Sequence, residues 1–477
     1  MKKLAINAQE LRDKIYGCWM GKNIGGTLGG PYEGRREILD VQGYSTPAGE
    51  PLPNDDLDLQ LVWLKAVQEH GPRAINARLL GEYWLNYITP HWNEYGVCKS
   101  NMRAGLLPPL SGEYRNEDWK HSNGAWIRSE IWACLAPGCP DVAIRFAYED
   151  ACVDHGAGEG TYAALFTAAV QSAAFVVSDR DELINIGLSK IPPDCRVAGS
   201  IKIALDAHAK GLTWQQAREL VVEDSKDLGW FQAPANVAFV VIGWIYGNGD
   251  FGKSITIATN CGDDTDCTAA TLGATFGIIL GKNGIPSEWI EPIGDRILTI
   301  SVDRGSMIVP GTLAELTDQV IAMTPHSLAA FKCNVEITDA NTDLAGIKDL
   351  NLTDDAVARK IWGRSPYAVT YDFIHTSVAL DYCQAPEIKP GVPFKLKITL
   401  ANNLPDLRHI ELIWRLPDGW SVSPGNKNHV ALGAKSEVCV EITADQVPEA
   451  VNRGVLEILA PGRPNVGFIP LIFFAAD

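Results

Sequence analysis

The chain has 477 residues, of which 46% are hydrophobic and 21% are charged, a composition typical of a globular protein with a large core. Its formal net charge of -17 is spread along the chain, which argues against nucleic acid or anionic membranes as partners, because both require clustered Lys and Arg. The 11 cysteines form no CxxC pair, and neither a signal peptide nor an 18-residue apolar run is visible, so we expect a cytoplasmic protein with reduced thiols and no transmembrane helix.

The first distinctive stretch is dense in glycine: YGCWMGKNIGGTLGGPYEGR, residues 16–35. It is not a P-loop, because no GK[ST] follows the glycines. Two interpretations stay open. The glycines serve tight helix packing, or they expose backbone to a ligand, with Glu33 projecting into the same pocket.

An acidic cluster opens the next predicted helix, at residues 53–71. Asn54 is suited to the N-cap, Asp55 and Asp56 to the first turn, and Gly71 to the C-cap. Carboxylates at a helix N-terminus favour the helix dipole, which is a sufficient structural reason for them. The alternative is that they form half of a binding site.

Two further stretches carry candidate contacts with a ligand. The aromatic-rich segment 83–96 is suited either to the core or to a wall that stacks on a base or sugar ring. The turn Ser122–Asn123–Gly124 precedes a probable helix. It either caps that helix or offers backbone N–H groups to a phosphate.

A second acidic cluster, CGDDTD at residues 261–266, runs directly into the small-residue helix predicted over 268–281. In that helix Gly273 and Gly277 are spaced to let a second helix backbone approach closely. Asp264 and Asp266 are two positions apart, and carboxylates held so close either share a proton or bind a cation. If the two clusters meet across one pocket, they supply four carboxylates, enough for a two-ion Mg²⁺ or Mn²⁺ site.

The hydrophobic pattern changes near residue 325. Residues 1–325 are predicted to be mainly helical, and 326–366 lack a clear period and are expected to form a connector. From 367 to 477 the period becomes two, in short segments such as FKLKITL and HIELIWRL separated by turn residues. We therefore predict a mainly α protein in which an all-α domain is followed by a small β-sandwich domain.

Five motifs, in this order, resemble the ADP-ribosylglycohydrolase family, which includes enzymes that remove ADP-ribose from modified proteins. The matching segments are GGTLGGPYE (25–33), NDDL (54–57), SNGAWIR (122–128), the pair Asp154–His155, and NCGDDTDCT (260–268). The resemblance spans roughly residues 10–325. It implies an all-α fold with a centre of two Mg²⁺ or Mn²⁺ ions.

The resemblance also implies roles for residues. As metal ligands it gives Asn54, Asp55, Asp56, Asp264 and Asp266. As catalytic residues it gives Glu33, Asp56 and Asp264, and as substrate-binding residues Ser122, Asn123, Gly124 and His155. This sequence departs from the family pattern at Gly26, where an aspartate is usual, and at Asn54, Leu57 and Cys267, where threonines are usual; a thiol is a poor ligand for hard cations.

The predicted activity is metal-dependent hydrolysis of an N- or O-glycosidic bond of the ribosyl type. Water activated at the metal centre, with help from Glu33 or an aspartate, would attack the anomeric carbon. The substrate is an ADP-ribosylated side chain, a nucleoside-like compound or a carbohydrate. The sandwich is a candidate carbohydrate-contacting or dimerising module, and in the second case it would form a homo-oligomer.

The alternative is a non-catalytic ligand-binding or structural protein on the same fold, as in lens-type crystallins related to this family. Whether Asp58, Asp263 and Cys267 contact metal stays open.

Overall fold

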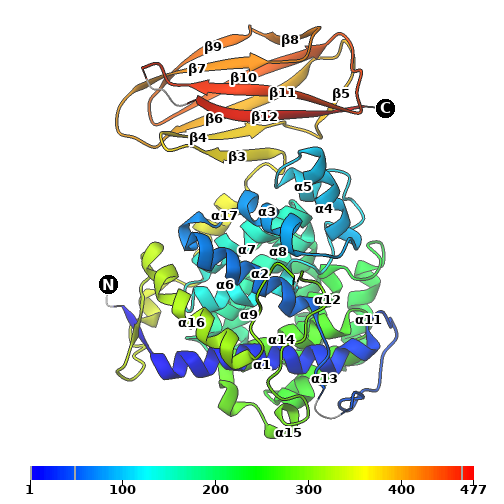
Figure 1. Ribbon diagram of the computed structural model, residues 1–477. Coiled ribbons are helices and arrows are strands. Elements are labelled where there is room, and N and C mark those ends of the chain that lie inside the picture. The colour runs from blue at the N-terminus through cyan, green and yellow to red at the C-terminus, as the bar shows by residue number, and fades with distance from the viewer. Residues whose placement is uncertain (1–2, 48–49, 304, 463–465, 477) are drawn as a thin grey trace. The chain divides into compact units, whose positions relative to one another are not determined.

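The computed structural model describes residues 3–47, 50–303, 305–462 and 466–476. It divides the chain into two compact units: residues 1–97 with 116–363, and residues 98–115 with 364–477. The first unit is mainly helical, and the second contains two five-stranded β-sheets together with the partly helical residues 98–115 (Figure 1). The prediction of a mainly helical region followed by a small β-sandwich is confirmed.

The helices differ in length, and the long ones lie in the first unit. In chain order they are α1 (Ala8–Gly29), α2 (Asp55–His70), α3 (Ala77–Tyr87), α4 (Asn93–Ala104), α5 (Leu110–Glu113), α6 (Glu130–Leu135), α7 (Pro140–His155), α8 (Glu159–Ala174), α9 (Arg180–Ser189), α10 (Arg196–Ala209), α11 (Trp214–Ser225), α12 (Ala233–Gly247), α13 (Phe251–Asn260), α14 (Thr265–Leu280), α15 (Ser287–Ile290), α16 (Leu313–Ala330) and α17 (Ala356–Trp362). Among the described residues, no helix is both long and apolar enough to cross a membrane.

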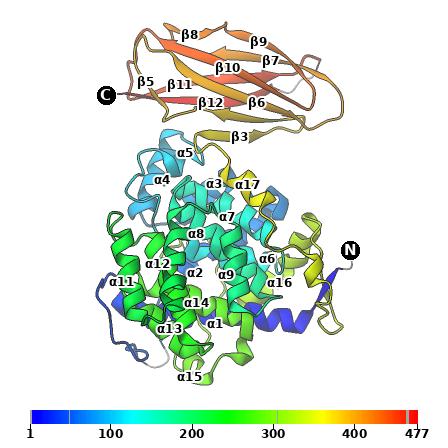
Figure 2. The same cartoon turned by 180° about the vertical axis from the view of Figure 1, so that it is seen from behind.

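Helices α1 and α14 form the closest helix pair in the first unit and run side by side in both views (Figures 1 and 2). A Cβ atom added at Gly21 would lie 2.0 Å from the Gly273 carbonyl oxygen, and one at Gly25 would lie 2.2 Å from that of Ala269. Only glycine permits such an approach. The predicted role of Gly273 is confirmed. A Cβ atom at Gly29 would lie 2.2 Å from the Thr265 carbonyl oxygen, so the same close packing holds the first turn of α14 against the end of α1.

Replacing Gly21 with alanine should therefore destabilise the helical unit by about 1–3 kcal/mol or more, because the added methyl group forces the two backbones apart. Gly199, inside α10, is a matched control, since a Cβ atom there meets nothing within 4 Å. Gly199→Ala should be neutral or stabilising by up to about 1 kcal/mol. Urea denaturation of both variants measures the difference; equal effects would contradict the packing argument.

The second unit is built from two five-stranded sheets. Their strand orders are β3-β4-β6-β10-β8 and β5-β12-β11-β7-β9, and the strands are β3 (Ala368–Asp372), β4 (Thr376–Asp381), β5 (Glu387–Ile388), β6 (Phe394–Asn402), β7 (Arg408–Arg415), β8 (Trp420–Ser423), β9 (Lys427–Leu432), β10 (Lys435–Ala444), β11 (Val451–Leu459) and β12 (Val466–Ala475). Side chains alternate between buried and exposed along β6 and β7, as two packed sheets require. Leu106, Leu110 and Tyr114, from far earlier in the chain, belong to the same core.

The region expected to be a connector has regular structure of its own. After the end of α16 it forms β2 (Val335–Thr338), which pairs in parallel with β1 (Leu4–Asn7), and then α17. Residues up to Gly363 belong to the helical unit. The β1–β2 pair shows why no helical or strand period was visible here, since a strand of four residues is too short to display one.

Candidate active site

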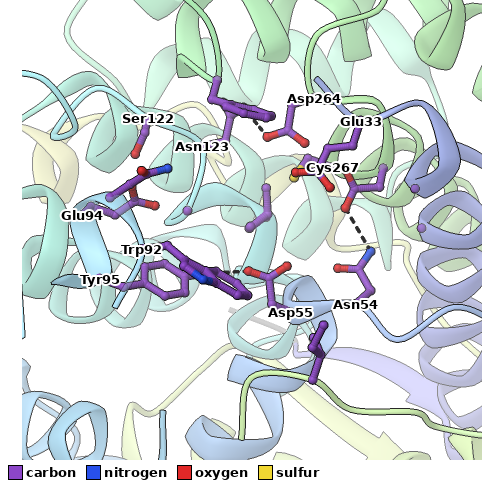
Figure 3. Close-up of a pocket in the computed structure, with 18 of the residues that line it drawn as sticks. Glu33, Asn54, Asp55, Trp92, Glu94, Tyr95, Ser122, Asn123, Asp264 and Cys267 are labelled. Carbon is purple, nitrogen blue, oxygen red and sulfur yellow. Dashed lines mark hydrogen bonds between the residues drawn. The ribbon is translucent and has the colours of Figure 1, made fainter. Parts of the chain in front are cut away.

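The helical unit contains a pocket of about 830 Å³. Its walls come from segments that are distant in sequence, as Figure 3 shows. The lining residues are Gly26, Gly30, Glu33, Leu52, Pro53, Asn54, Asp55, His91, Trp92, Asn93, Glu94, Tyr95, Ser122, Asn123, Gly124, Ile127, Phe231, Asp264, Asp266, Cys267 and Ile300.

The two acidic clusters meet in this pocket because the first turns of α2 and α14 converge. Ligand atoms of Glu33, Asp264 and Asp266 lie within 4.8 Å of one another, and so do those of Asp56, Asp266 and Cys267. Asp266 is therefore shared by two overlapping groups. The structure brings together residues that are more than 200 positions apart in the chain.

Crowding and burial keep these carboxyls from ionising easily. Burial, and then the charge of Glu33, raise the pKa of Asp266 to about 7. Although much of the Glu33 side chain is exposed, burial of its carboxyl group and the charges of Asp55 and Asp56 raise its pKa to about 7. Burial followed by the charge of Asp266 raises the pKa of Asp264 well above its usual range. Such shifts mark carboxyl groups that have no positively charged partner of their own among the described residues.

The donor set around Asp264 and Asp266 suits a hard cation. Both side chains are buried, and the Oδ1 atom of each has no hydrogen-bond partner among the described residues. The second oxygen of Asp264 accepts a hydrogen bond from Asn123 Nδ2 at 2.7 Å, which orients the carboxylate. Unpartnered buried carboxylate oxygens are costly, and a divalent ion with oxygen ligands removes that cost.

Asp56 has a different environment. The Lys22 ammonium lies 3.1 Å from Asp56 Oδ2 and 3.1 Å from Glu130 Oε1, and all three side chains are buried. The Cys267 thiol donates to Asp56 Oδ1 at 3.4 Å. Burial would lower the pKa of Lys22, but the Asp56 and Glu130 carboxylates outweigh it and raise that pKa. Lys22 is thus a buried cation inside the acidic cluster.

Asn54 is oriented as a cap and not as a metal ligand. Its Oδ1 accepts a hydrogen bond from the Asp56 N–H at 2.7 Å, and its Nδ2 lies 3.4 Å from Asp266 Oδ2. A Cβ atom at Gly26 would lie 2.4 Å from that Nδ2, so the glycine leaves room for the amide. This arrangement differs from the expected ligand role, because the carbonyl oxygen is used by the helix and the amide group faces the carboxylate.

Asp58 and Asp263, the acids whose contact with metal the sequence left open, accept hydrogen bonds from the backbone of neighbouring loops. Asp58 Oδ2 accepts the backbone N–H groups of Ile300 and Ser301, both at 2.6 Å. Asp263 Oδ1 accepts the N–H of Phe231 at 3.0 Å, and its Oδ2 accepts from Asn236 Nδ2 at 3.2 Å. Each carboxylate therefore positions a residue of the pocket wall, Ile300 or Phe231.

The predicted substrate-binding residues fall into two sets. Ser122, Asn123 and Gly124 line the pocket. His155 does not; its ring is fully buried, and Ser122 Oγ lies 3.0 Å from its Nε2. His155 therefore lies behind two residues that line the pocket, Ser122 and Glu94, which differs from the expectation of direct contact with substrate.

The aromatic segment divides between the two proposed roles. Trp84 is fully buried in the core, whereas Trp92 is 49% exposed and lines the pocket together with Tyr95. The Trp92 and Tyr95 rings are stacked with centroids 6.1 Å apart, and Tyr95 donates a hydrogen bond to Asp55 Oδ2 at 3.1 Å. These two rings form a wall beside the acids (Figure 3).

Sequence reasoning missed Glu94 and Lys22. Glu94 is buried opposite the acidic cluster and groups with Asp154 and His155. Burial raises its pKa, with His155 acting in the opposite direction. The sequence did contain a hint of each role. Glu94 is an acidic residue within an aromatic-rich segment, and Lys22 is a charged residue within a glycine-rich helix.

Comparison with known proteins places this site in a family. A family model described as ADP-ribosylglycohydrolase matches residues 7–325. ADP-ribosylarginine hydrolase Tri1 of Pseudomonas putida (strain GB-1) is 22% identical over 302 residues, which are 60% of this chain and 76% of that protein.

Among solved structures, an ADP-ribosylglycohydrolase-related protein complex has 19% identity and a TM-score of 0.45, covering 67% of this chain and 99% of that one. A FixG-related protein from Vibrio parahaemolyticus has 14% identity and a TM-score of 0.18, covering 21% of this chain and 94% of that one. The family model extends over more than half of the chain and over all five motifs, so this protein belongs to the ADP-ribosylglycohydrolase family and is a hydrolase of that type.

Proposed function

We propose that this protein hydrolyses the glycosidic bond between the ribose C1 of an ADP-ribosyl group and a side-chain nitrogen or oxygen, in a reaction that depends on Mg²⁺ or Mn²⁺. The observation that carries the proposal is the convergence of Glu33, Asp264 and Asp266 in the pocket, with two buried carboxylate oxygens left unpartnered. The relative named as an ADP-ribosylarginine hydrolase supports arginine as one acceptor to test.

Asp264, Asp266 and Glu33 would hold the cation, with Asp55 beside them. When bound, a divalent cation supplies orientation of sugar hydroxyls and stabilisation of negative charge. Asn123 and Asn54 lie against Asp264 and Asp266 and fix the two carboxylates. Fixed ligands of this kind are what precise positioning of a substrate requires.

Glu33 is placed to receive a proton. It projects into the pocket from the turn after η1 (Gly30–Tyr32), with part of its side chain exposed. A water molecule beside it would attack the anomeric carbon while Glu33 takes the proton. The new bond joins the water oxygen to C1, and the bond from C1 to the leaving nitrogen or oxygen breaks. Glu33 then passes the proton that it took from water to the leaving atom, which regenerates the carboxylate.

The remaining walls suit the two ends of an ADP-ribosyl group. Trp92 and Tyr95 offer ring faces for stacking on a base or sugar. The turn at Ser122–Gly124 also lines the pocket and lies beside Asp264, because Asn123 Nδ2 donates to Asp264 Oδ2. We assign the aromatic wall to ring recognition and this turn to the part of the substrate nearest the cation.

The direct test is release of ADP-ribose from ADP-ribosylarginine and ADP-ribosylserine, with Mn²⁺, with Mg²⁺ and with EDTA. Cleavage of either substrate that stops in EDTA supports the proposal, and the preferred substrate identifies the bond type. A nucleoside or a simple glycoside serves as the comparison substrate. Cleavage of the comparison substrate alone, or turnover that survives EDTA, would overturn the proposal.

The raised pKa values predict how stability depends on pH. Glu33 and Asp266 have ordinary pKa values of 4.5 and 3.8 and folded values of about 7, so the folded state binds protons more tightly than the unfolded chain. The resulting stabilisation is complete below a pH of about 4 and is lost as the pH rises through about 7. In EDTA, the Tm of the wild type should fall more steeply over this range than that of Glu33→Gln. Mn²⁺ should reduce the difference, and identical slopes in EDTA would contradict the prediction.

A further inference from the structure

The Lys22 ammonium is completely coordinated by the protein. It donates hydrogen bonds to the carbonyl oxygen of Ile127 and to Glu130 Oε1, and it forms an ion pair with Asp56 Oδ2 at 3.1 Å. The side chain is 1% exposed. One carbonyl and two carboxylate oxygens around a buried positive charge are the surroundings of a bound cation, and here the cation is covalently part of the chain.

The partners of Lys22 are themselves fixed. Glu130 Oε2 accepts a hydrogen bond from Gln60 Nε2 at 2.9 Å, and Glu130 Oε1 accepts a second one from Gln171 Nε2 at 3.2 Å. These contacts hold the carboxylate in place on the ammonium. Lys22 is therefore not a mobile side chain that a metal ion displaces at low cost.

Both oxygens of Asp56 lie against other groups of the protein. Oδ2 accepts no hydrogen bond but forms an ion pair with the Lys22 ammonium at 3.1 Å, and the Cys267 thiol donates to Oδ1. A divalent ion on Asp56 would lie close to the ammonium and be repelled by it. Asp56 forms a group with Asp266 and Cys267, and Cys267 offers sulfur where Mg²⁺ and Mn²⁺ prefer oxygen.

The group formed by Glu33, Asp264 and Asp266 has no positively charged partner among the described residues and has oxygen ligands free for a cation. No Lys or Arg forms an ion pair with Glu33, Asp264 or Asp266 in the ranges that the structure describes. Asp264 Oδ1 and Asp266 Oδ1 are buried and accept no hydrogen bond from the described residues, and unlike Asp56 Oδ2 they have no ammonium beside them. Asp266 is thus shared by two groups: the group with Asp56 and Cys267 has the Lys22 ammonium beside it, and the group with Glu33 and Asp264 has no such positive charge among the described side chains.

From this asymmetry we infer that the centre binds one divalent cation instead of two, at Glu33, Asp264 and Asp266, and that the Lys22 ammonium replaces the second cation beside Asp56. This inference rests on the proposed metal-dependent function. It departs from the two-ion centre that the family resemblance implies.

Counting bound Mn²⁺ tests the inference in the wild-type protein. Equilibrium dialysis with metal analysis should give one Mn²⁺ per chain, and electron paramagnetic resonance should show an isolated ion. Two ions per chain with an exchange-coupled spectrum would overturn the inference while leaving metal-dependent hydrolysis intact. One ion without hydrolysis of any ADP-ribosyl substrate would support the inference and overturn the proposed function. No bound ion would overturn both.

Variants test the role of the ammonium. Lys22→Met combined with Cys267→Thr removes the cation and restores an oxygen ligand, so this protein should bind a second Mn²⁺ and show a coupled spectrum. Cys267→Thr alone should stay at one ion. Lys190→Met is the matched control, because Lys190 is also fully buried and pairs with Asp141 at 2.8 Å, outside the pocket. A double variant that folds and still binds one ion would overturn the role of Lys22. If it does not fold, the wild-type count decides.

Discussion

Asp264→Asn is expected to abolish divalent-dependent hydrolysis, lowering kcat/KM by about a thousandfold or more. The substitution keeps the size of the side chain but removes the charge that would hold the cation. Metal stabilisation of developing charge is worth several kcal/mol, and each step of about 1.4 kcal/mol is a factor of ten in rate. Steady-state kinetics on the preferred ADP-ribosyl substrate measures the loss, and the increase in Tm on adding Mn²⁺ should disappear as well.

Asp263→Asn is the neighbouring control. Its carboxylate contacts Phe231 and Asn236 and not the other acids of the pocket, so this variant should retain the Mn²⁺-dependent increase in Tm. If Asp264→Asn kept Mn²⁺ binding, or if both variants lost it equally, the assignment of Asp264 as a metal ligand would be wrong.

Arg128→Met should be the most destabilising substitution near the pocket. Arg128 is fully buried and donates to Asp154 Oδ1 at 2.8 Å and to Asp150 Oδ1 at 3.0 Å. Removing one partner from a buried ion pair leaves uncompensated charge and costs about 3–5 kcal/mol. Because Arg128 also donates to the Gly124 carbonyl oxygen, the Ser122–Gly124 turn should loosen, and KM should rise in whatever protein remains folded.

Arg196→Met is the matched control for that experiment. Arg196 pairs with Asp227 at 2.9 Å, but both side chains are substantially exposed, and such pairs contribute about 1 kcal/mol or less. Urea denaturation followed by tryptophan fluorescence compares the two variants. A similar loss in both would show that the buried network does not stabilise the helical unit.

Much of the architecture could be predicted from local sequence patterns. The change of hydrophobic period predicted where helices are followed by strands. Gly273 and Gly277, four residues apart in a helix, predicted a close contact with a second helix. Local patterns also indicated the acids. Asp55 and Asp264 lie at the starts of predicted helices, the first preceded by the cap residue Asn54 and the second in a turn. That they share one pocket depended on the family resemblance, since the residues themselves say nothing of what lies across a fold.

Other residues were not predictable from local patterns, because their roles depend on partners that only folding supplies. Lys22 belongs to a glycine-rich helix, and nothing near it in the sequence indicates that Asp56 and Glu130 surround it. His155 was expected to contact substrate, but burial separates it from the pocket and leaves Ser122 in that position. Asn54 shows the same limit: a good cap residue cannot be distinguished from a ligand until its carbonyl oxygen is located.

The β-sandwich unit is not built from C-terminal residues alone. Its core includes Leu106, Leu110 and Tyr114, which lie in the sequence between the two stretches of the helical unit, while its strands follow Gly363. Residues 98–115 and 364–477 therefore form one compact unit from two separate stretches of the chain. A gene cut after codon 363 would encode an enzyme carrying three apolar side chains whose core had been deleted.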